Sequence, residues 1–343
     1  MINLLMILAC AGGADTAPET DKASTENYTA SAESVQSSTP ANISDKLGMD
    51  RLSRTESEAV FGQALSYEHY TLRPLSLEIF PDFRVSGALY EPKKEGKHPA
   101  FLMAHGHFGE GKSSGEAQAP AHALAHRGYV VLALDTPGVE EGDKKGRQIH
   151  LEAGLENREA LESAGTTAMA LQLHGLQAGL DYFNSRDDIG WIGVGGASGG
   201  AVQAFYLTQI DARPEALVMA SFVPMPRDNK KGGCPCDWVP GGWKENLVSK
   251  LDIPNLWMSE GAEPKPDGLG SKGFFVTHSG PHGFERPMIE EAVTWMDSLH
   301  SLEVDRPLPE QLPHAPATAL ASKSVGNASI PKLLSRPPTN VTK

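Results

Sequence analysis

The chain has 343 residues, of which 40% are hydrophobic and 21% are charged, so neither a collagen-like repeat nor a wholly disordered chain fits. Lys and Arg number 30 against 43 Asp and Glu, which gives a formal net charge of −13. Nucleic-acid binding depends on clustered Lys and Arg that neutralise phosphates, so we expect no nucleic-acid partner. No pattern in the sequence predicts an oligomeric state.

The N-terminus resembles an export signal. Residues 1–9 are almost entirely apolar, and the order Ile7-Leu8-Ala9-Cys10 resembles a bacterial lipobox, whose cysteine is lipidated. The apolar run is too short for a transmembrane helix, which needs roughly 20 residues. It also lacks the basic start of an ordinary signal peptide, so a plain apolar N-terminus stays as the alternative. We expect residues 1–10 to be a lipoprotein signal, the protein to be exported to the cell envelope, and membrane contact to occur only through Cys10.

The segments that flank the middle of the chain have compositions that cannot bury a core. Residues 11–57 are rich in Ser, Thr and Ala, and residues 301–343 are rich in Pro, Ser and Ala. We therefore expect a flexible tether over 11–57 and a disordered tail over 301–343. The remaining residues, 58–300, have the length of one large domain.

Strand-like and helix-like runs alternate through this middle part. Residues 70–79 and 85–90 flank a Pro-Asp turn and predict a hairpin at the edge of a sheet. Short apolar runs predict strands at 100–104, 129–134, 189–194, 216–222, 255–259 and 274–278. Helical patterns fall at 117–127, 158–183, 201–208 and 286–300. This alternation predicts an α/β fold with a mostly parallel central sheet and helices on both faces.

The segment Gly196-Ala197-Ser198-Gly199-Gly200 matches the G-x-S-x-G pattern. It follows a predicted strand and precedes a predicted helix, which is the context of a nucleophile elbow. Glycines are needed there because side chains at Gly196 and Gly200 would collide with the neighbouring strand and helix. Ser198 is therefore the candidate nucleophile, and a glycine-rich turn without a reactive serine is the alternative.

A serine hydroxyl needs a histidine to take its proton. His282 lies in a loop after the last predicted strand and before the last helix, where the chain order serine, acid, histidine places the base. His278 is the nearest competitor, but its position at the end of the strand favours a packing role. We expect His282 to be the base.

The acid of such a triad orients the imidazole and stabilises its charged form. Glu263 follows the strand predicted at 255–259 and a short turn, which favours it as the acid. Glu260, Asp267 and Asp228 are the competing carboxylates. The developing oxyanion also needs donors, and we expect the backbone N–H groups of Gly199 and His107 to supply them.

At these residues the chain resembles the α/β-hydrolase superfamily, and within it the bacterial acetylxylan-esterase-like and dienelactone-hydrolase-like esterases. The stretches that carry the resemblance are His105-Gly106-His107-Phe108 with Gly111-Lys112, Val131-Leu132-Ala133-Leu134-Asp135, Gly196-Ala197-Ser198-Gly199-Gly200, Cys234-Pro235-Cys236-Asp237-Trp238-Val239-Pro240-Gly241, and His282 with Arg286-Pro287-Met288.

The resemblance implies a carboxylic ester hydrolase that acts on short-acyl esters of small molecules or carbohydrates, with no cofactor and no metal. It implies Ser198 as nucleophile, His282 as base, and an acid where this chain has Glu263. Members of the family place a helix between the acid and the histidine. The glycines and prolines between Glu263 and Phe274 predict that this helix is shortened or lost here.

Two other functions remain as alternatives. A metal-dependent hydrolase would use His105 and His107, with His122 and His126 at helical i, i+4 spacing, although we expect the latter two on a solvated helix face. A non-catalytic ligand-binding member of the fold is the second. Cys234 and Cys236 are either a strained disulfide or a pair of buried thiols.

Overall fold

The computed structural model describes residues 41–108, 110–136, 157–221, 246–261, 264–300, 306–322 and 330–335. Cys10, Cys234 and Cys236 lie outside these residues, so the predictions made for them stay predictions. Among the helices of the described part, none is both long and apolar enough to cross a bilayer.

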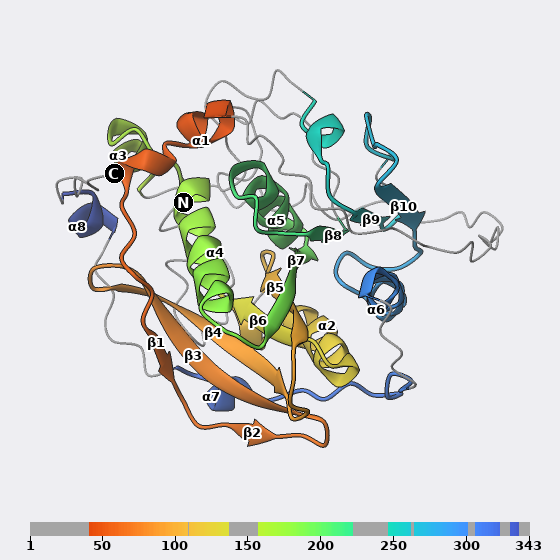
Figure 1. The fold of residues 1–343 in the computed structure, drawn as a ribbon. Helices are drawn as coiled ribbons and strands as arrows, with labels where there is room; N and C mark the ends of the chain where they lie inside the picture. The colour runs from red at the N-terminus through yellow and green to blue at the C-terminus, as the bar shows by residue number, and fades with distance from the viewer. Residues whose placement is uncertain are drawn as a thin grey trace, which may run out of the picture.

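The strands of the described residues form one ten-stranded sheet, in the order β1-β3-β4-β6-β5-β7-β8-β9-β10, with β2 beside β3 (Figure 1). Their bounds are β1 (Ala59–Phe61), β2 (Leu65–Ser66), β3 (Tyr70–Phe80), β4 (Phe83–Pro92), β5 (His98–Ala104), β6 (Val130–Leu134), β7 (Ile189–Ala197), β8 (Ala216–Ala220), β9 (Asn255–Ser259) and β10 (Gly273–Thr277).

The sheet is antiparallel at one end and parallel through the rest. β3 and β4 form the predicted hairpin, but β1 and β2 pair outside β3, so the hairpin is not the outermost part of the sheet. From β6 to β10 every neighbouring pair is parallel. The carboxyl ends of these parallel strands therefore meet at one edge, where ligands bind in open α/β sheets.

Helices cover both faces of the sheet, as predicted. Residues of α1 (Ala41–Leu47), α4 (Ala168–Asn184) and α5 (Gly199–Ile210) belong to the core on one face, while α2 (Gly115–Arg127) and α6 (Arg286–His300) belong to the core on the other. Figure 1 shows α4 and α5 side by side over the first of these faces. The predicted fold class is confirmed.

The helix predicted over 158–183 is two helices, α3 (Arg158–Ser163) and α4. The chain turns between them at Gly165, whose φ of 75° suits glycine, and Thr167 caps α4 by accepting a hydrogen bond from the N–H of Ala170 at 3.1 Å. Residues that favour helix stand on both sides of Gly165, which is why the sequence suggests one helix.

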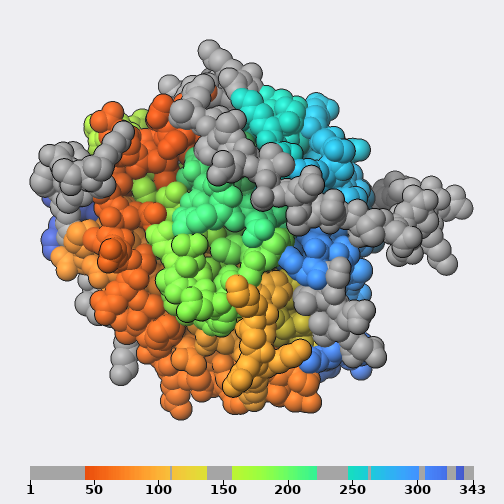
Figure 2. Space-filling model, in the orientation of Figure 1, coloured from red at the N-terminus to blue at the C-terminus, as the bar shows by residue number. Residues whose placement is uncertain are grey.

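Parts of both flanking segments are folded onto the domain, contrary to the expected tether and tail. Ile43 and Leu47 are one helical turn apart in α1 and are buried in the core, so α1 belongs to the domain. In Figure 2 this N-terminal part, in red and orange, lies directly beside the green segments that contain α4 and α5.

The C-terminal segment 306–322 is likewise held against α2. The Gln118 side chain donates to the carbonyl of Ala315 at 2.9 Å and accepts from its N–H at 2.8 Å. Leu320, in α7 (Ala317–Leu320), is fully buried, and α8 (Ile330–Leu334) also buries apolar side chains. A composition rich in Pro and Ser hides these few apolar anchors, so the sequence alone suggests disorder.

Candidate active site

Ser198 stands at the turn between β7 and α5, as the elbow pattern predicts. Its backbone has φ 54° and ψ −123°, a region that non-glycine residues adopt only when their surroundings enforce it. The N–H of Ser198 donates to the carbonyl of Ala220 at 2.9 Å, which fixes the turn to the end of β8. The side chain is partly exposed and does not cap α5. Its hydroxyl is therefore accessible to solvent and is not used to cap the helix.

The glycines around Ser198 are required by close packing. A β-carbon placed on Gly196 would lie 2.1 Å from the carbonyl oxygen of Ala104 in β5, and one on Gly200 would lie 2.2 Å from the same oxygen. Both distances are far below van der Waals contact, so neither position tolerates a side chain without movement of the strand. The steric reason proposed for these glycines agrees with the structure.

His282 lies in the loop between β10 and α6, and its Nδ1 is 2.9 Å from each carboxylate oxygen of Glu260. The side chains of His282 and Glu260 are 44% and 19% exposed, so the pair lies at the surface of the site. Because a carboxylate accepts, Nδ1–H donates to Glu260, which leaves Nε2 as the nitrogen that can accept a proton. This is the arrangement in which a carboxylate orients a catalytic base.

Glu260 is one of the competitors that the sequence leaves open, and it directly follows β9. Glu263 and Asp228 lie outside the described residues. Asp267 is exposed, and its backbone carbonyl accepts from the side chain of Asn246. Of the candidate carboxylates that the structure describes, Glu260 is the one hydrogen-bonded to His282.

The short path from the acid to the histidine agrees with the predicted loss of a helix. β10 pairs directly and in parallel with β9, and the described residues between them contain no helix. His278, the competing histidine, follows β10 directly, and its N–H donates to the carbonyl of Ser259 at 2.8 Å. Burial lowers the pKa of its imidazole, with Glu291 opposing the shift. A packing role for His278 fits this position.

Two residues that the sequence analysis missed hold the loop of His282. Ser221 Oγ donates to the carbonyl of Gly283 at 2.6 Å and lies 3.2 Å from its N–H, and the Glu116 carboxylate accepts from the N–H of Phe284 at 2.8 Å. Ser221 follows β8 as Ser198 follows β7, and this shared position at a strand end is the signal that could have revealed it. Glu116, in the first turn of α2, offers no such signal.

These contacts bring the loop of His282 to the same edge as Ser198. Ser198 is bonded to Ala220, and the next residue, Ser221, is bonded to Gly283, which follows His282. Both Ser198 and His282 are described, and the structure places no hydrogen bond between the serine hydroxyl and the imidazole. Such bonds are often long in a free enzyme and tighten when substrate binds.

The two residues expected to supply the oxyanion donors, Gly199 and His107, lie next to the elbow. Gly199 is the first residue of α5, where backbone N–H groups have no partner within the helix and the helix dipole favours negative charge. The imidazole of His107 lies over Gly199, since a β-carbon there would be 2.7 Å from the His107 ring. A β-carbon placed on Gly106 would lie 3.0 Å from Ser198 Cβ. The loop that carries the N–H of His107 is thus adjacent to the elbow.

The architecture is shared with solved esterase structures. At 22% identity and a TM-score of 0.65, the chain is similar to methylesterase BT1017, with 81% of this chain and 66% of that one covered. It is also similar to a putative acetyl xylan esterase from Bacteroides fragilis NCTC 9343 (16% identity, TM-score 0.57, 74% and 86% covered). A third similar structure is acetyl xylan esterase 1 from Thermoanaerobacterium sp. JW/SL YS485 (13% identity, TM-score 0.54, 77% of this chain and 96% of that one covered).

The chain has the α/β-hydrolase fold. Likeness at these low identities establishes the fold, and this chain spans only 66% of the length of the methylesterase. No protein-family model matches the sequence, and no curated protein matches it.

Within this hydrolase fold, the described histidines of the metal alternative do not form a cluster of metal ligands. His122 is fully buried, with Nδ1 2.6 Å from the Tyr70 hydroxyl, so the expectation that it lies on a solvated helix face is wrong. That side of α2 packs on β3 and β4. His126 Nε2 contacts the carbonyl of Pro307 at 3.2 Å. Among the described residues, no three His, Cys, Asp or Glu side chains are arranged to hold a metal ion.

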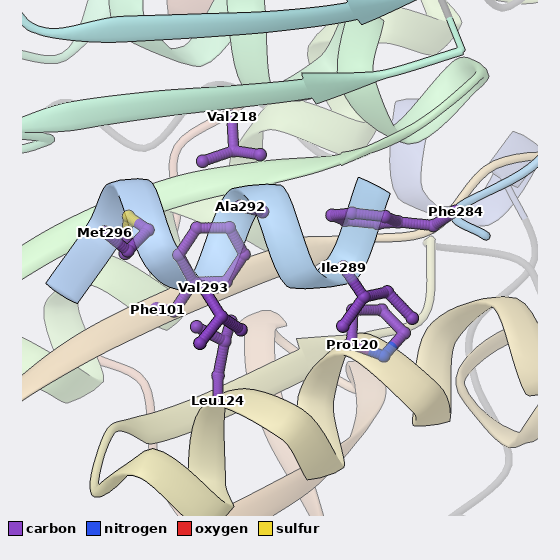
Figure 3. A pocket seen from close by; sticks show the side chains of 9 residues that line it. All are labelled: Phe101, Pro120, Leu124, Val218, Phe284, Ile289, Ala292, Val293 and Met296. Carbon is purple, nitrogen blue, oxygen red and sulfur yellow. The ribbon is translucent and has the colours of Figure 1, made fainter. Parts of the chain in front are cut away.

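A small apolar pocket lies between α2, α6 and the sheet (Figure 3). It is lined by Phe101, Pro120, Leu124, Val218, Phe284, Ile289, Ala292, Val293 and Met296. Every lining side chain is hydrophobic and none belongs to the proposed triad, so this pocket is a packing gap behind the loop of His282. The candidate residues Ser198, Glu260 and His282 lie instead at the carboxyl edge of the parallel strands.

Proposed function

We propose that this protein hydrolyses short-acyl carboxylic esters through an acyl-enzyme on Ser198. The observation that carries the proposal is a partly exposed serine at the β7–α5 elbow, whose backbone is strained and whose hydroxyl does not cap the helix. The Glu260–His282 pair at the same edge supplies a base already oriented for a neighbouring hydroxyl.

The proposed reaction has two steps, formation of an acyl-enzyme and its hydrolysis, and the same residues act in both. Ser198 Oγ attacks the ester carbonyl carbon while His282 Nε2 takes its proton, and Glu260 stabilises the imidazolium. The N–H groups of Gly199 and His107 hold the oxyanion. Collapse of the intermediate expels the alcohol, which takes the proton from His282. Water then repeats the sequence on the acyl-enzyme and releases the carboxylic acid.

The substrate class rests on similarity. The similar structures include a methylesterase and two proteins named as acetyl xylan esterases, of which one is marked as putative. A small acyl group on a carbohydrate or another small alcohol is therefore the substrate we propose. Glu260 is the acid we propose, and Glu263 is the alternative that mutagenesis decides.

Turnover of p-nitrophenyl acetate by the purified protein and by Ser198→Ala tests the reaction. Ser185→Ala, at an exposed serine after α4, is the matched control and should keep the full rate. Equal turnover by wild type and Ser198→Ala would remove the nucleophile from the mechanism. Loss of activity on treatment with a chelator would favour the metal alternative instead.

A further inference from the structure

A buried cluster of charged and polar side chains lies beside the elbow and takes no part in the proposed chemistry. Asp135, directly after β6, is 4% exposed, and Lys112 is 2% exposed. Lys112 Nζ donates to Asp135 Oδ2 at 2.8 Å and to Ser86 Oγ at 3.0 Å, and Ser86 Oγ donates to the same Oδ2 at 2.5 Å. Lysine and aspartate are almost never buried so completely unless they are paired.

The other oxygen of the same carboxylate contacts both ends of the loop. Asp135 Oδ1 accepts from the backbone N–H of Lys112 at 2.7 Å and lies 3.2 Å from His105 Nε2. His105 Nδ1 donates to the carbonyl of Gly106 at 2.7 Å. One carboxylate therefore contacts both His105 and Lys112, the residues that begin and end the loop carrying His107.

The backbone of the loop is shaped to admit this carboxylate. Gly111 has φ 52°, and a β-carbon there would lie 2.3 Å from Asp135 Oδ1. A side chain at this position would thus collide with the carboxylate and would also strain the backbone. The Gly111-Lys112 pair places a glycine where the carboxylate approaches and a cation where its charge needs a partner.

The charges keep Asp135 ionised in spite of its burial. Burial alone would raise the pKa of the Asp135 carboxyl, but Lys112 and His105 outweigh that effect and hold the pKa below its usual range. An ionised carboxylate accepts stronger hydrogen bonds than a neutral one. Replacing a buried ion pair by apolar residues is often neutral or stabilising, so stability alone does not explain this cluster.

We propose that Asp135 is a positioning residue for the oxyanion hole, which holds the 105–112 loop so that the N–H of His107 faces the developing oxyanion beside Ser198. This inference rests on the proposed function. The position of the His107 ring over Gly199 and the close contact of Gly106 with Ser198 link the loop to the elbow. Asp135 acts through the loop and touches no substrate.

Asp135→Asn tests the proposal because it removes the charge while keeping the shape. Loss of one oxyanion donor typically costs 10²–10³ in kcat, so kcat for p-nitrophenyl acetate should fall about 100-fold while KM changes less than about threefold. Affinity for a trifluoromethyl ketone, which forms an oxyanion adduct with a serine, should fall in parallel. If Asp135 only stabilised the fold, the molecules that remain folded would keep the wild-type kcat and the wild-type affinity for the ketone.

Two further variants separate positioning from stability. Lys112→Met combined with Asp135→Asn removes both charges, and should show the same fall in kcat even if the single variant is too unstable to purify. Asp297→Asn breaks a different, largely buried ion pair, that with Arg127, and should keep kcat. A folded double variant with wild-type kcat and ketone affinity would overturn the proposal.

Amide hydrogen exchange distinguishes failure of this inference from failure of the proposed function. Exchange across residues 105–112 should be faster in Asp135→Asn than in wild type and unchanged in Asp297→Asn. This readout needs no activity, so it decides whether Asp135 holds the loop even if the wild type hydrolyses no ester. Unchanged exchange in Asp135→Asn would contradict the inference by itself.

Discussion

Two neighbouring strands of the sheet end in serines whose backbones have nearly the same unusual φ. Ser198 follows β7 with φ 54°, and Ser221 follows β8 with φ 50°. Ser198 is partly exposed at the start of a helix, whereas Ser221 is fully buried and its hydroxyl is bonded to Gly283. Backbone strain therefore does not identify a nucleophile by itself. Access to solvent and a hydroxyl free of structural bonds separate the two.

The roles of the two serines follow from their partners. Ser221 fixes the residue next to His282, and the Ser198 turn is fixed to the residue before Ser221. Ser221 thus holds the loop of His282, and we propose that Ser198 attacks the substrate. Variants at the two positions should differ in how much activity they lose and in how much stability they lose.

The largest expected effect is that of Ser198→Ala. Removal of a serine nucleophile costs on the order of 10⁶ in kcat in a well-studied triad enzyme, so ester turnover should fall to the background of the assay. The thermal midpoint should change little, because the side chain is partly exposed and does not cap α5. Steady-state kinetics and calorimetry on one preparation measure both, and a variant with more than a tenth of wild-type kcat would contradict the assignment.

The acid should come next in size. Replacing the triad carboxylate by its amide costs about 10⁴ in kcat, because the imidazole is then held in the wrong tautomer. We expect a loss of that order for Glu260→Gln, whose carboxylate contacts His282 Nδ1 through both oxygens. Glu263→Gln is the matched control and should stay within about threefold of wild type. The reverse outcome would restore the acid that the sequence analysis favoured.

Ser221→Ala should have a smaller effect on activity and a larger one on stability. Gly283 loses the hydroxyl that its carbonyl and N–H contact, and an unsatisfied buried group costs about 1–3 kcal/mol. A shifted His282 should lower kcat about tenfold, since small misplacements reduce catalysis strongly. Denaturant unfolding and kinetics give the two numbers.

Ser221→Gly separates the hydroxyl from the backbone strain. Glycine adopts φ 50° without strain, so part of the stability should return, while the hydroxyl stays absent and kcat should remain low. If Ser221→Gly recovers wild-type kcat, the strain and not the hydroxyl bond controls the loop of His282.

The sequence predicts features that depend on neighbouring residues and does not predict contacts between distant segments. Gly196 and Gly200 predict the elbow because a strand, a turn and a helix follow one another along the chain. The contact between Glu260 and His282 could not be predicted from the sequence, because it depends on where β9 ends and how a loop 22 positions later docks on Ser221. Contacts between distant segments leave no local pattern.

The C-terminal segment shows a related limit. Ala315 and Leu320 are buried apolar residues in a Pro-rich stretch, and the backbone of Ala315 is held by the side chain of Gln118 in α2. The parallel strands β6 and β8, in contrast, are continuous apolar runs that are buried along their whole length, so their positions follow from the sequence. Strands and helices with a clear hydrophobic pattern were predicted, and segments that are ordered only by contacts with distant residues were not.

The contrast between buried and exposed copies of one side chain extends to the histidines. His282 is exposed, whereas His174 is 4% exposed and its Nε2–H donates to the carbonyl of Met49 at 3.1 Å. Burial, helped by Arg54, lowers the pKa of His174 from 6.5 to about 4. Burial and His314 lower the pKa of His122 to the same value.

These two histidines should make the domain sensitive to acid. The folded state binds fewer protons than the unfolded state between pH 6.5 and about 4, so protonation favours unfolding there. The contribution of each histidine is complete above pH 6.5 and is lost as the pH falls through about 4, and it is on the order of 3 kcal/mol. His174→Gln keeps a donor for Met49 but does not titrate, so its free energy of unfolding should fall less steeply over this range. Urea unfolding at a series of pH values measures the slope, and equal slopes for the variant and wild type would mean that His174 does not contribute to the acid sensitivity.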